Sequence, residues 1–222
     1  MLDKVQAVIF DMDGTLIDSM WVWDEIDHDF FSERGFDFTD AYQKEIEGMS
    51  FTETAAYTKQ LYQLAETVEE LKQIWNEMAR QKYAEAVELK PGAVQFLAHC
   101  RQQGIKMGIA TSNSRELIRI IADKYDFHSY IDVIVTSCDV SKGKPAPDVY
   151  LEAARQLGVN PKNCLVFEDV IAGILAGKNA GMKVCAVEDA YSADQKEKKI
   201  EIADYYIEDY FNIIDFKLAK QA

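Results

Sequence analysis

Two pairs of acidic residues, each placed directly after a short apolar run, give the strongest sign of chemistry in this chain. Asp11 and Asp13 follow the run AVIF, and Glu168 and Asp169 follow the run CLVF. If these carboxylates share one crevice, they repel each other, and burial drives protons onto some of them. A hard cation with oxygen ligands relieves the repulsion, and Mg²⁺ suits a site with few carboxylates, bound water and a phosphate oxygen. The acidic pairs therefore predict a Mg²⁺ site.

Hydroxyl, amide and ammonium groups elsewhere in the chain could bind a phosphate beside that cation. Thr111, Ser112 and Asn113 follow the run KMGIA and precede a predicted helix start, which is a common anion-binding position. Lys144 precedes a proline that biases it toward an extended backbone, and its ammonium could neutralise a transferring phosphoryl group. Structural interpretations also exist: a polar turn for the first acidic pair, a helix cap for Thr111 and an exposed loop cation for Lys144.

Five short apolar runs that end on polar residues predict the strands that position these groups. They are rich in Val and Ile, fit strands covered on both faces, and span 7–10, 106–110, 132–136, 164–167 and 183–187. Helical segments lie between them, at 91–104 and 115–125 and after Pro147 and Asp169. This alternation predicts βαβ units and an α/β fold with a mostly parallel sheet, in which ligands bind beyond the carboxyl ends of the strands.

The stretch 20–88 contains no strand-like run and predicts a helical insertion directly after the first strand. Apolar residues from Met20 to Phe30 follow helical spacing, and capping boxes at 50–53 and 67–70 mark two further helix starts. We expect its aromatic residues to form mostly the core of this helical bundle. An insertion at this point would cover the crevice as a lid. The predicted division is a discontinuous core, 1–17 and 88–222, and a helical cap, 18–87.

The composition narrows the possible partners and the compartment. With 24 Lys and Arg against 38 Asp and Glu, the formal net charge of the 222 residues is −14. This charge argues against nucleic acid and anionic membranes as partners, but a small phosphorylated metabolite carried with a cation is compatible with it. No apolar run approaches the length of a membrane span or a secretory signal, and the cysteines form no CxxC pair. We expect a cytoplasmic monomer, with the charged run 194–201 as a solvated helix face.

The order of these motifs resembles that of a known family. The matching elements are Asp11-Met-Asp13-Gly-Thr, the strand end at Thr111, Lys144-Pro and Glu168-Asp169. Together they resemble the four motifs of the haloacid dehalogenase superfamily. The position and helical character of the insertion resemble the cap of the branch that includes phosphoglycolate phosphatase and β-phosphoglucomutase. The resemblance implies a Rossmann-like core with a helical cap inserted after the first strand.

The resemblance also implies a role for each matching residue. Asp11 would be the nucleophile that forms an aspartyl-phosphate, and Asp13 the general acid and base. Thr111 and Lys144 would hold the phosphoryl oxygens, which places Ser112 and Asn113 among the phosphate-binding candidates. The metal would be held by Asp11, the backbone carbonyl of Asp13, Asp169 and Glu168, the last either directly or through a bound water.

Departures from the family pattern separate the possible reactions. Dehalogenases and phosphonate-cleaving members lack a second acid such as Asp13. β-Phosphoglucomutases carry a cap sequence resembling Leu-Lys-Gly-Val-Ser-Arg and a cap histidine, where this chain has residues 46–51 with Glu47, and Trp23. We therefore expect a Mg²⁺-dependent phosphatase of a small phosphate monoester, such as a sugar phosphate. The alternatives are a β-phosphoglucomutase-like mutase and, from another class, a non-catalytic phosphate-ligand sensor.

Overall fold

The structure, a computed structural model that describes residues 1–213, is built around a six-stranded sheet. The strand order is β5-β4-β1-β6-β7-β8, and each neighbouring pair is parallel. The strands are β1 Ala7–Phe10, β4 Lys106–Thr111, β5 Val133–Thr136, β6 Cys164–Glu168, β7 Lys183–Val187 and β8 Tyr205–Ile207. The predicted α/β fold with a parallel sheet is therefore confirmed.

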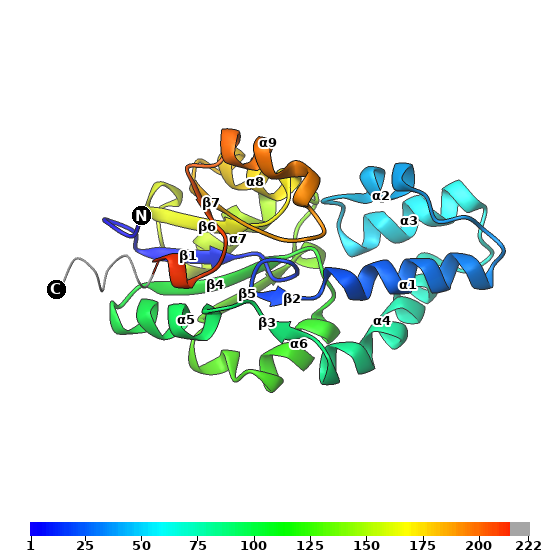
Figure 1. The fold of residues 1–222 in the computed structure, drawn as a ribbon, viewed down its shortest axis with the longest axis horizontal. Coiled ribbons are helices and arrows are strands. Elements are labelled where there is room, and N and C mark those ends of the chain that lie inside the picture. Colours follow the sequence, from blue (N-terminus) through cyan, green and yellow to red (C-terminus); the bar gives the residue numbers. More distant parts are fainter. Residues whose placement is uncertain (214–222) are drawn as a thin grey trace.

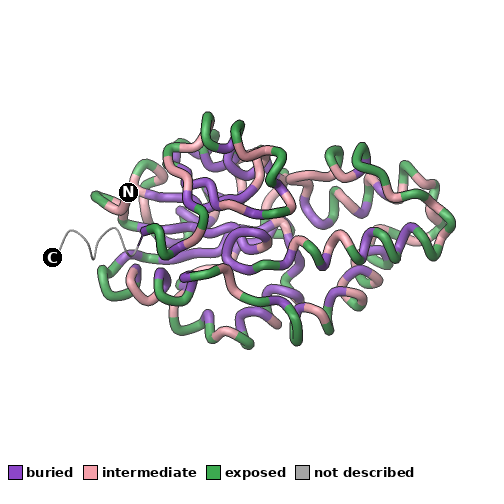
Figure 2. The backbone as a smooth tube through the Cα atoms, in the orientation of Figure 1, coloured by how far each residue is buried: buried purple, intermediate pink, exposed green. Residues whose placement is uncertain are grey.

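Helices cover both faces of the sheet (Figure 1). The helices α5 (Ala93–Gln102) and α6 (Arg115–Lys124) pack on one face, and α7 (Asp148–Leu157) and α8 (Ile171–Asn179) pack on the other. Side chains of β1 alternate between these layers, because successive residues of a strand point to opposite faces. All four residues of β1 are buried (Figure 2), so both of its faces are covered, and this explains why its sequence is continuously apolar.

The helical insertion lies beyond one end of the sheet and contains four helices (Figure 1). They are α1 Met20–Glu33, α2 Asp40–Ile46, α3 Phe51–Tyr62 and α4 Val68–Glu85. Both predicted capping boxes are present. The Ser50 hydroxyl accepts from the backbone N–H of Glu53, and the Thr67 hydroxyl accepts from the backbone N–H of Glu70. In each box the glutamate side chain accepts in return from the backbone N–H of the capping residue. The short helix α2, which the sequence analysis did not predict, is capped by Thr39.

The chain enters and leaves this insertion through two adjacent short strands. In this pair, β2 (Ile17–Asp18) runs antiparallel to β3 (Glu88–Leu89). The exact division into a core of 1–17 and 88–222 and a cap of 18–87 stays a prediction, and residues 214–222 of that core range lie outside the described residues. We use the word cap below for α1–α4 and their connections. Within residues 1–213, every helix is too short or too polar to span a bilayer.

The charged run 194–201 differs in one respect from the expected solvated helix face. Most of it is exposed, and residues 196–201 belong to α9 (Lys196–Ile202), but the Lys199 side chain is fully buried. Its ammonium donates to Ser192 Oγ at 2.9 Å and to the Val187 carbonyl oxygen at 3.4 Å. Burial lowers the pKa of Lys199, against the opposing charges of Asp169 and other acids. The prediction was wrong here because one position of this short helix faces the core.

Candidate active site

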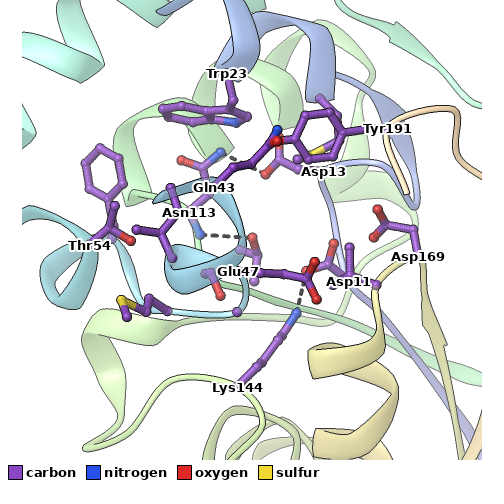
Figure 3. A pocket seen from close by; sticks show the side chains of 18 of the residues that line it. Asp11, Asp13, Trp23, Gln43, Glu47, Thr54, Asn113, Lys144, Asp169 and Tyr191 are labelled. Carbon is purple, nitrogen blue, oxygen red and sulfur yellow. Dashed lines mark hydrogen bonds and ion pairs between the residues drawn. The ribbon is translucent and has the colours of Figure 1, made fainter. Parts of the chain in front are cut away.

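The predicted site residues line one cavity of about 240 Å³ at the carboxyl ends of the central strands. These residues are Asp11, Asp13, Thr111, Ser112, Asn113, Lys144, Glu168 and Asp169. Because β1, β4 and β6 are adjacent and parallel, the residues that follow them emerge at the same edge of the sheet. Lys144 reaches the cavity from the connection between β5 and α7. Residues of the cap complete the wall (Figure 3).

The ammonium of Lys144 lies between two buried carboxylates. Its Nζ is 2.6 Å from Asp11 Oδ1 and 2.5 Å from Glu168 Oε1, and Figure 3 shows it reaching toward Asp11. The hydroxyl of Tyr150 donates to the same oxygen of Glu168 at 2.5 Å. The Lys144 side chain is 4% exposed, so its interpretation as an exposed loop cation was wrong.

Burial and neighbouring charges act on these groups in opposite directions. Burial raises the pKa of Asp11 to about 7, and Lys144 opposes this rise while Glu168 adds to it. Burial disfavours the charged form of Lys144, but the two carboxylates together hold its pKa above the usual value. Burial, followed by Glu168 and Asp11, raises the pKa of Asp169. Among these groups, Lys144 is thus held as a fixed positive charge beside Asp11.

Asp169 presents a buried carboxylate oxygen with no hydrogen bond from residues 1–213. Its Oδ1 accepts from Thr15 Oγ1 at 3.0 Å, whereas Oδ2 is the unpartnered atom. The backbone of Gly14, at φ +77°, approaches so closely that a Cβ there would lie 2.2 Å from this oxygen. Oxygens of Asp11, Glu168 and Asp169 all lie within 4.8 Å of one another. This donor set fits a hard divalent cation such as Mg²⁺.

Asp13 is held by donors from both the core and the cap. Ser19 Oγ donates to its Oδ1 at 2.6 Å, the Tyr83 hydroxyl donates to the same oxygen, and Asn113 Nδ2 donates to Oδ2 at 2.8 Å. Trp23 Nε1 in turn donates to the Tyr83 hydroxyl at 2.9 Å. Burial and the Asp13 charge raise the pKa of Tyr83, so its hydroxyl keeps the proton that it donates. Ser19 and Tyr83 were not predicted from the sequence, because neither lies in a motif.

The strand end at Thr111 forms the part of the cavity beside Asn113. Thr111 Oγ1 accepts from the Asn113 N–H at 3.1 Å. Its interpretation as a helix cap was wrong, since Ser114 is the residue that caps α6. The carbonyl oxygen of Ser112 accepts from the backbone N–H of Phe51 at 3.2 Å, which ties this strand end to the cap.

Three aromatic side chains of the cap line the cavity. Trp23 and Phe51 have ring centroids 5.9 Å apart, and those of Phe51 and Trp75 are 5.8 Å apart. The indole N–H of Trp23 is already used on Tyr83. The expectation that the cap aromatics are mostly core is confirmed, because Phe30, Phe31 and Trp75 belong to the core cluster and Trp23 packs against it. Trp23 and Trp75 also form part of the cavity wall.

Polar side chains close the cavity where the cap meets the core. Gln43 of α2 donates to the hydroxyl of Tyr191, and Gln195 Nε2 donates to a carboxylate oxygen of Glu47 at 2.5 Å. Figure 3 shows Gln43, Glu47 and Tyr191 around the same space as Asp11. Burial raises the pKa of Glu47, with the Gln195 bond opposing it. These contacts hold the cap against the mouth of the site.

Asp27 of α1 is a further acid in the cavity wall, and the motif analysis did not find it. The residue is 9% exposed, and within residues 1–213 its carboxylate accepts no hydrogen bond. Its charge reaches Tyr42 and Tyr191, whose hydroxyls are engaged with Thr58 and Gln43. Burial, with a smaller contribution from Asp24, raises the pKa of Asp27 to about 7.

Asp27→Asn is expected to change how the free energy of unfolding depends on pH. The folded protein holds the Asp27 proton up to about pH 7, whereas the unfolded chain releases it near 3.8. Wild-type stability therefore falls as pH rises through this window, by at most about 1.4 kcal/mol per pH unit from this group. Asp27→Asn has no carboxyl to lose a proton, so its stability does not fall in this way. The difference in melting temperature between the variant and the wild type should therefore be small at pH 4 and largest above pH 7, with the variant melting higher. An advantage that does not change with pH in thermal melts would contradict the assignment.

Comparison with known proteins identifies the family. A family model for haloacid dehalogenase-like hydrolases matches residues 8–187. The chain is 34% identical over 185 residues to the bifunctional riboflavin kinase/FMN phosphatase of Arabidopsis thaliana, a match that covers 82% of this chain and 48% of that protein. It thus spans about half the length of this relative. It is also 30% identical over 180 residues to the phosphorylated carbohydrates phosphatase of Thermotoga maritima, covering 81% and 83% of the two chains.

A solved structure shows the same fold. CbbY from Rhodobacter sphaeroides, in complex with phosphate, superposes with a TM-score of 0.81 and 23% identity, covering 93% of this chain and 95% of that one. The chain therefore belongs to the haloacid dehalogenase-like hydrolase family, which confirms the family predicted from the four motifs. The protein is accordingly a hydrolase, and both relatives named above are phosphatases or contain one.

Proposed function

We propose that the protein is a Mg²⁺-dependent phosphatase that hydrolyses a small phosphate monoester, such as a sugar phosphate, through an aspartyl-phosphate on Asp11. The observation that carries this proposal is the buried group of Asp11, Lys144 and Glu168 beside the unpartnered oxygen of Asp169. The similarity to a phosphatase of phosphorylated carbohydrates supports the substrate class.

The cation would be held by Asp11, Glu168 and Asp169, with the backbone carbonyl of Asp13 as the further ligand that the family resemblance implies. When bound, Mg²⁺ supplies positive charge that offsets the carboxylates and the phosphoryl oxygens. The chemical steps then fall to the side chains of this chain.

In the first step a carboxylate oxygen of Asp11 attacks phosphorus, and the bond between phosphorus and the ester oxygen breaks. Asp13 gives its proton to the departing alcohol oxygen. In the second step Asp13 takes a proton from water, which attacks the same phosphorus and releases phosphate from Asp11. Lys144 stabilises the charge that spreads over the phosphoryl oxygens, and Thr111, Ser112 and Asn113 orient them.

The function is tested with a panel of phosphate esters, each incubated with added Mg²⁺ and with a chelator. We expect release of inorganic phosphate from at least one sugar phosphate with Mg²⁺, and a loss of about 100-fold or more in the chelator, since the cation offsets several charges in a dry site. An exposed-residue variant, Asp3→Asn, is the matched control and should behave like the wild type. Equal release with and without the chelator would contradict the metal assignment.

The two alternatives give different products in the same panel. A mutase converts glucose 1-phosphate to glucose 6-phosphate, whereas a phosphatase releases glucose and phosphate. The position of Glu47 in the cavity wall favours the phosphatase, because its carboxylate repels a second phosphate group. A non-catalytic sensor would bind an ester and leave it intact.

A further inference from the structure

The cap side of the cavity wall carries an acid and aromatic side chains that have no role in the proposed reaction. We propose that Asp27 is a specificity residue that accepts a hydrogen bond from a hydroxyl group of the leaving alcohol, and that this wall selects uncharged, sugar-like alcohols over acidic ones. The inference rests on the proposed phosphatase function, because it assigns the part of the substrate that leaves. It concerns a residue that lies outside the four motifs.

Asp27 is a mostly buried acid whose carboxylate is open to the cavity. The residue is 9% exposed, lines the cavity, and has no hydrogen-bond donor among residues 1–213. A carboxylate that is mostly buried and has no donor from the protein reduces the stability of the folded protein. A ligand hydroxyl that enters the cavity would supply the missing donor. The carboxylate that lowers the stability of the free protein would then strengthen the binding of the ligand.

The cap also presents aromatic side chains to the cavity. Trp23, Phe51 and Trp75 line the cavity with Asp27 and follow one another at ring-centroid distances of 5.9 and 5.8 Å. Flat apolar surfaces beside a few polar groups bind ligands that carry both kinds of surface. A sugar-like alcohol has this character, since its C–H groups can pack on the rings while its hydroxyls reach a carboxylate.

The wall also contains more acidic than basic residues. Outside the reaction centre, the acidic residues that line the cavity are Asp27, Glu47 and Asp194. The basic residue there is Lys44, which is exposed. Above about pH 7, where even the raised pKa of Asp27 leaves its carboxyl ionised, this excess of acids repels a leaving group with a carboxylate or a second phosphate. Neutral hydroxyls carry no such penalty and can donate to these acids. The wall therefore discriminates by charge as well as by hydrogen bonding.

The test compares Asp27→Leu and Asp27→Asn with the wild type on three phosphate esters: sorbitol 6-phosphate, hexyl phosphate and phosphoglycolate. The wild type should prefer sorbitol 6-phosphate in kcat/KM. The ratio of kcat/KM for sorbitol 6-phosphate to that for hexyl phosphate should fall about 10-fold or more in Asp27→Leu, as expected for a lost hydrogen bond to a charged group. Asp27→Asn, which keeps an acceptor oxygen and nearly the same shape, should give a smaller fall.

Asp29→Asn is the matched control, because it removes one exposed carboxylate from the same helix and should leave the ratio unchanged. A wild type that prefers hexyl phosphate or phosphoglycolate would overturn the proposal. An unchanged ratio in both Asp27 variants would overturn it as well, while leaving the phosphatase function intact.

A binding measurement separates this inference from the phosphatase function itself. Calorimetry with sorbitol 6-phosphate compares Asp11→Asn with Asp11→Asn/Asp27→Leu, so that binding is measured without turnover. We expect about 10-fold weaker binding by the double variant. If the wild type hydrolyses no ester but this difference appears, the phosphatase function fails and the recognition role of Asp27 stands. Equal binding, or none by either variant, overturns that role.

Discussion

Asp11→Asn is expected to lower the rate of phosphate release by about 10⁴-fold or more, a loss typical of removing the nucleophile of an enzyme. The amide is a poor nucleophile toward phosphorus, yet it has nearly the shape of the carboxylate. Its oxygen can still accept from Lys144 Nζ, which lies 2.6 Å from Asp11 Oδ1 in the native site. The variant should therefore fold and lose turnover rather than structure.

The measurement is the initial rate of phosphate release from the best ester of the panel, with thermal melting as the check on folding. Asp3→Asn, an exposed substitution of the same chemistry near the same strand, is the control for the preparation. Activity of Asp11→Asn within about 10-fold of the wild type would show that another group attacks phosphorus, given the size of the loss expected for a nucleophile.

Lys144→Met should produce the largest loss of stability among single substitutions in the site. Removing the ammonium leaves the carboxylates of Asp11 and Glu168 buried without their shared partner, at distances from Nζ of 2.6 and 2.5 Å in the native protein. Breaking a buried ion pair by removing one partner destabilises a protein by about 3–5 kcal/mol. For a chain of this size the melting temperature should fall by roughly 10 °C.

The melts are recorded in a chelator, because a cation at the carboxylates would offset the missing charge. Lys142→Met is the matched control: the lysine is exposed, lies in the same loop, and forms no ion pair within residues 1–213, so its loss should change the melting temperature little. A second substitution, Glu168→Gln, should recover part of the stability in the Lys144→Met background. Equal, small shifts for Lys142→Met and Lys144→Met would contradict the buried ion-pair assignment.

The sequence was sufficient for the fold class and for the gathering of the motif residues. Strands buried on both faces are continuously apolar, so β1, β4 and β6 could be recognised from composition alone. The carboxyl ends of parallel strands meet at one edge, so polar residues after those runs were expected to lie together. The structure brings them together in one cavity, while their individual roles stay predictions.

The rest of the site depends on contacts that sequence spacing does not encode. Tyr83 meets Asp13 across 70 positions of the chain, through the packing of α4 against the core. Asp27 is one acid among many in an acidic sequence, and its burial follows from the way α1 packs in the cap. The Lys199 side chain was expected in solvent for the same reason, since local charge density does not show which face of a short helix is covered.

The pairing of β2 with β3 determines which part of this fold can vary in length and sequence. Ile17 lies opposite Leu89 and Asp18 opposite Glu88 in a separate two-stranded sheet, so the chain enters the cap and returns from it side by side. For the remainder of the fold, everything between these residues behaves as one long hairpin loop, and the entropy of closing such a loop grows slowly with its length. Segments between them can be lengthened, shortened or exchanged as a unit while the strand register stays the same. The geometry of these two pairs therefore lets most of the cap vary while the core stays the same, provided that Ser19 and Tyr83 keep their hydrogen bonds to Asp13.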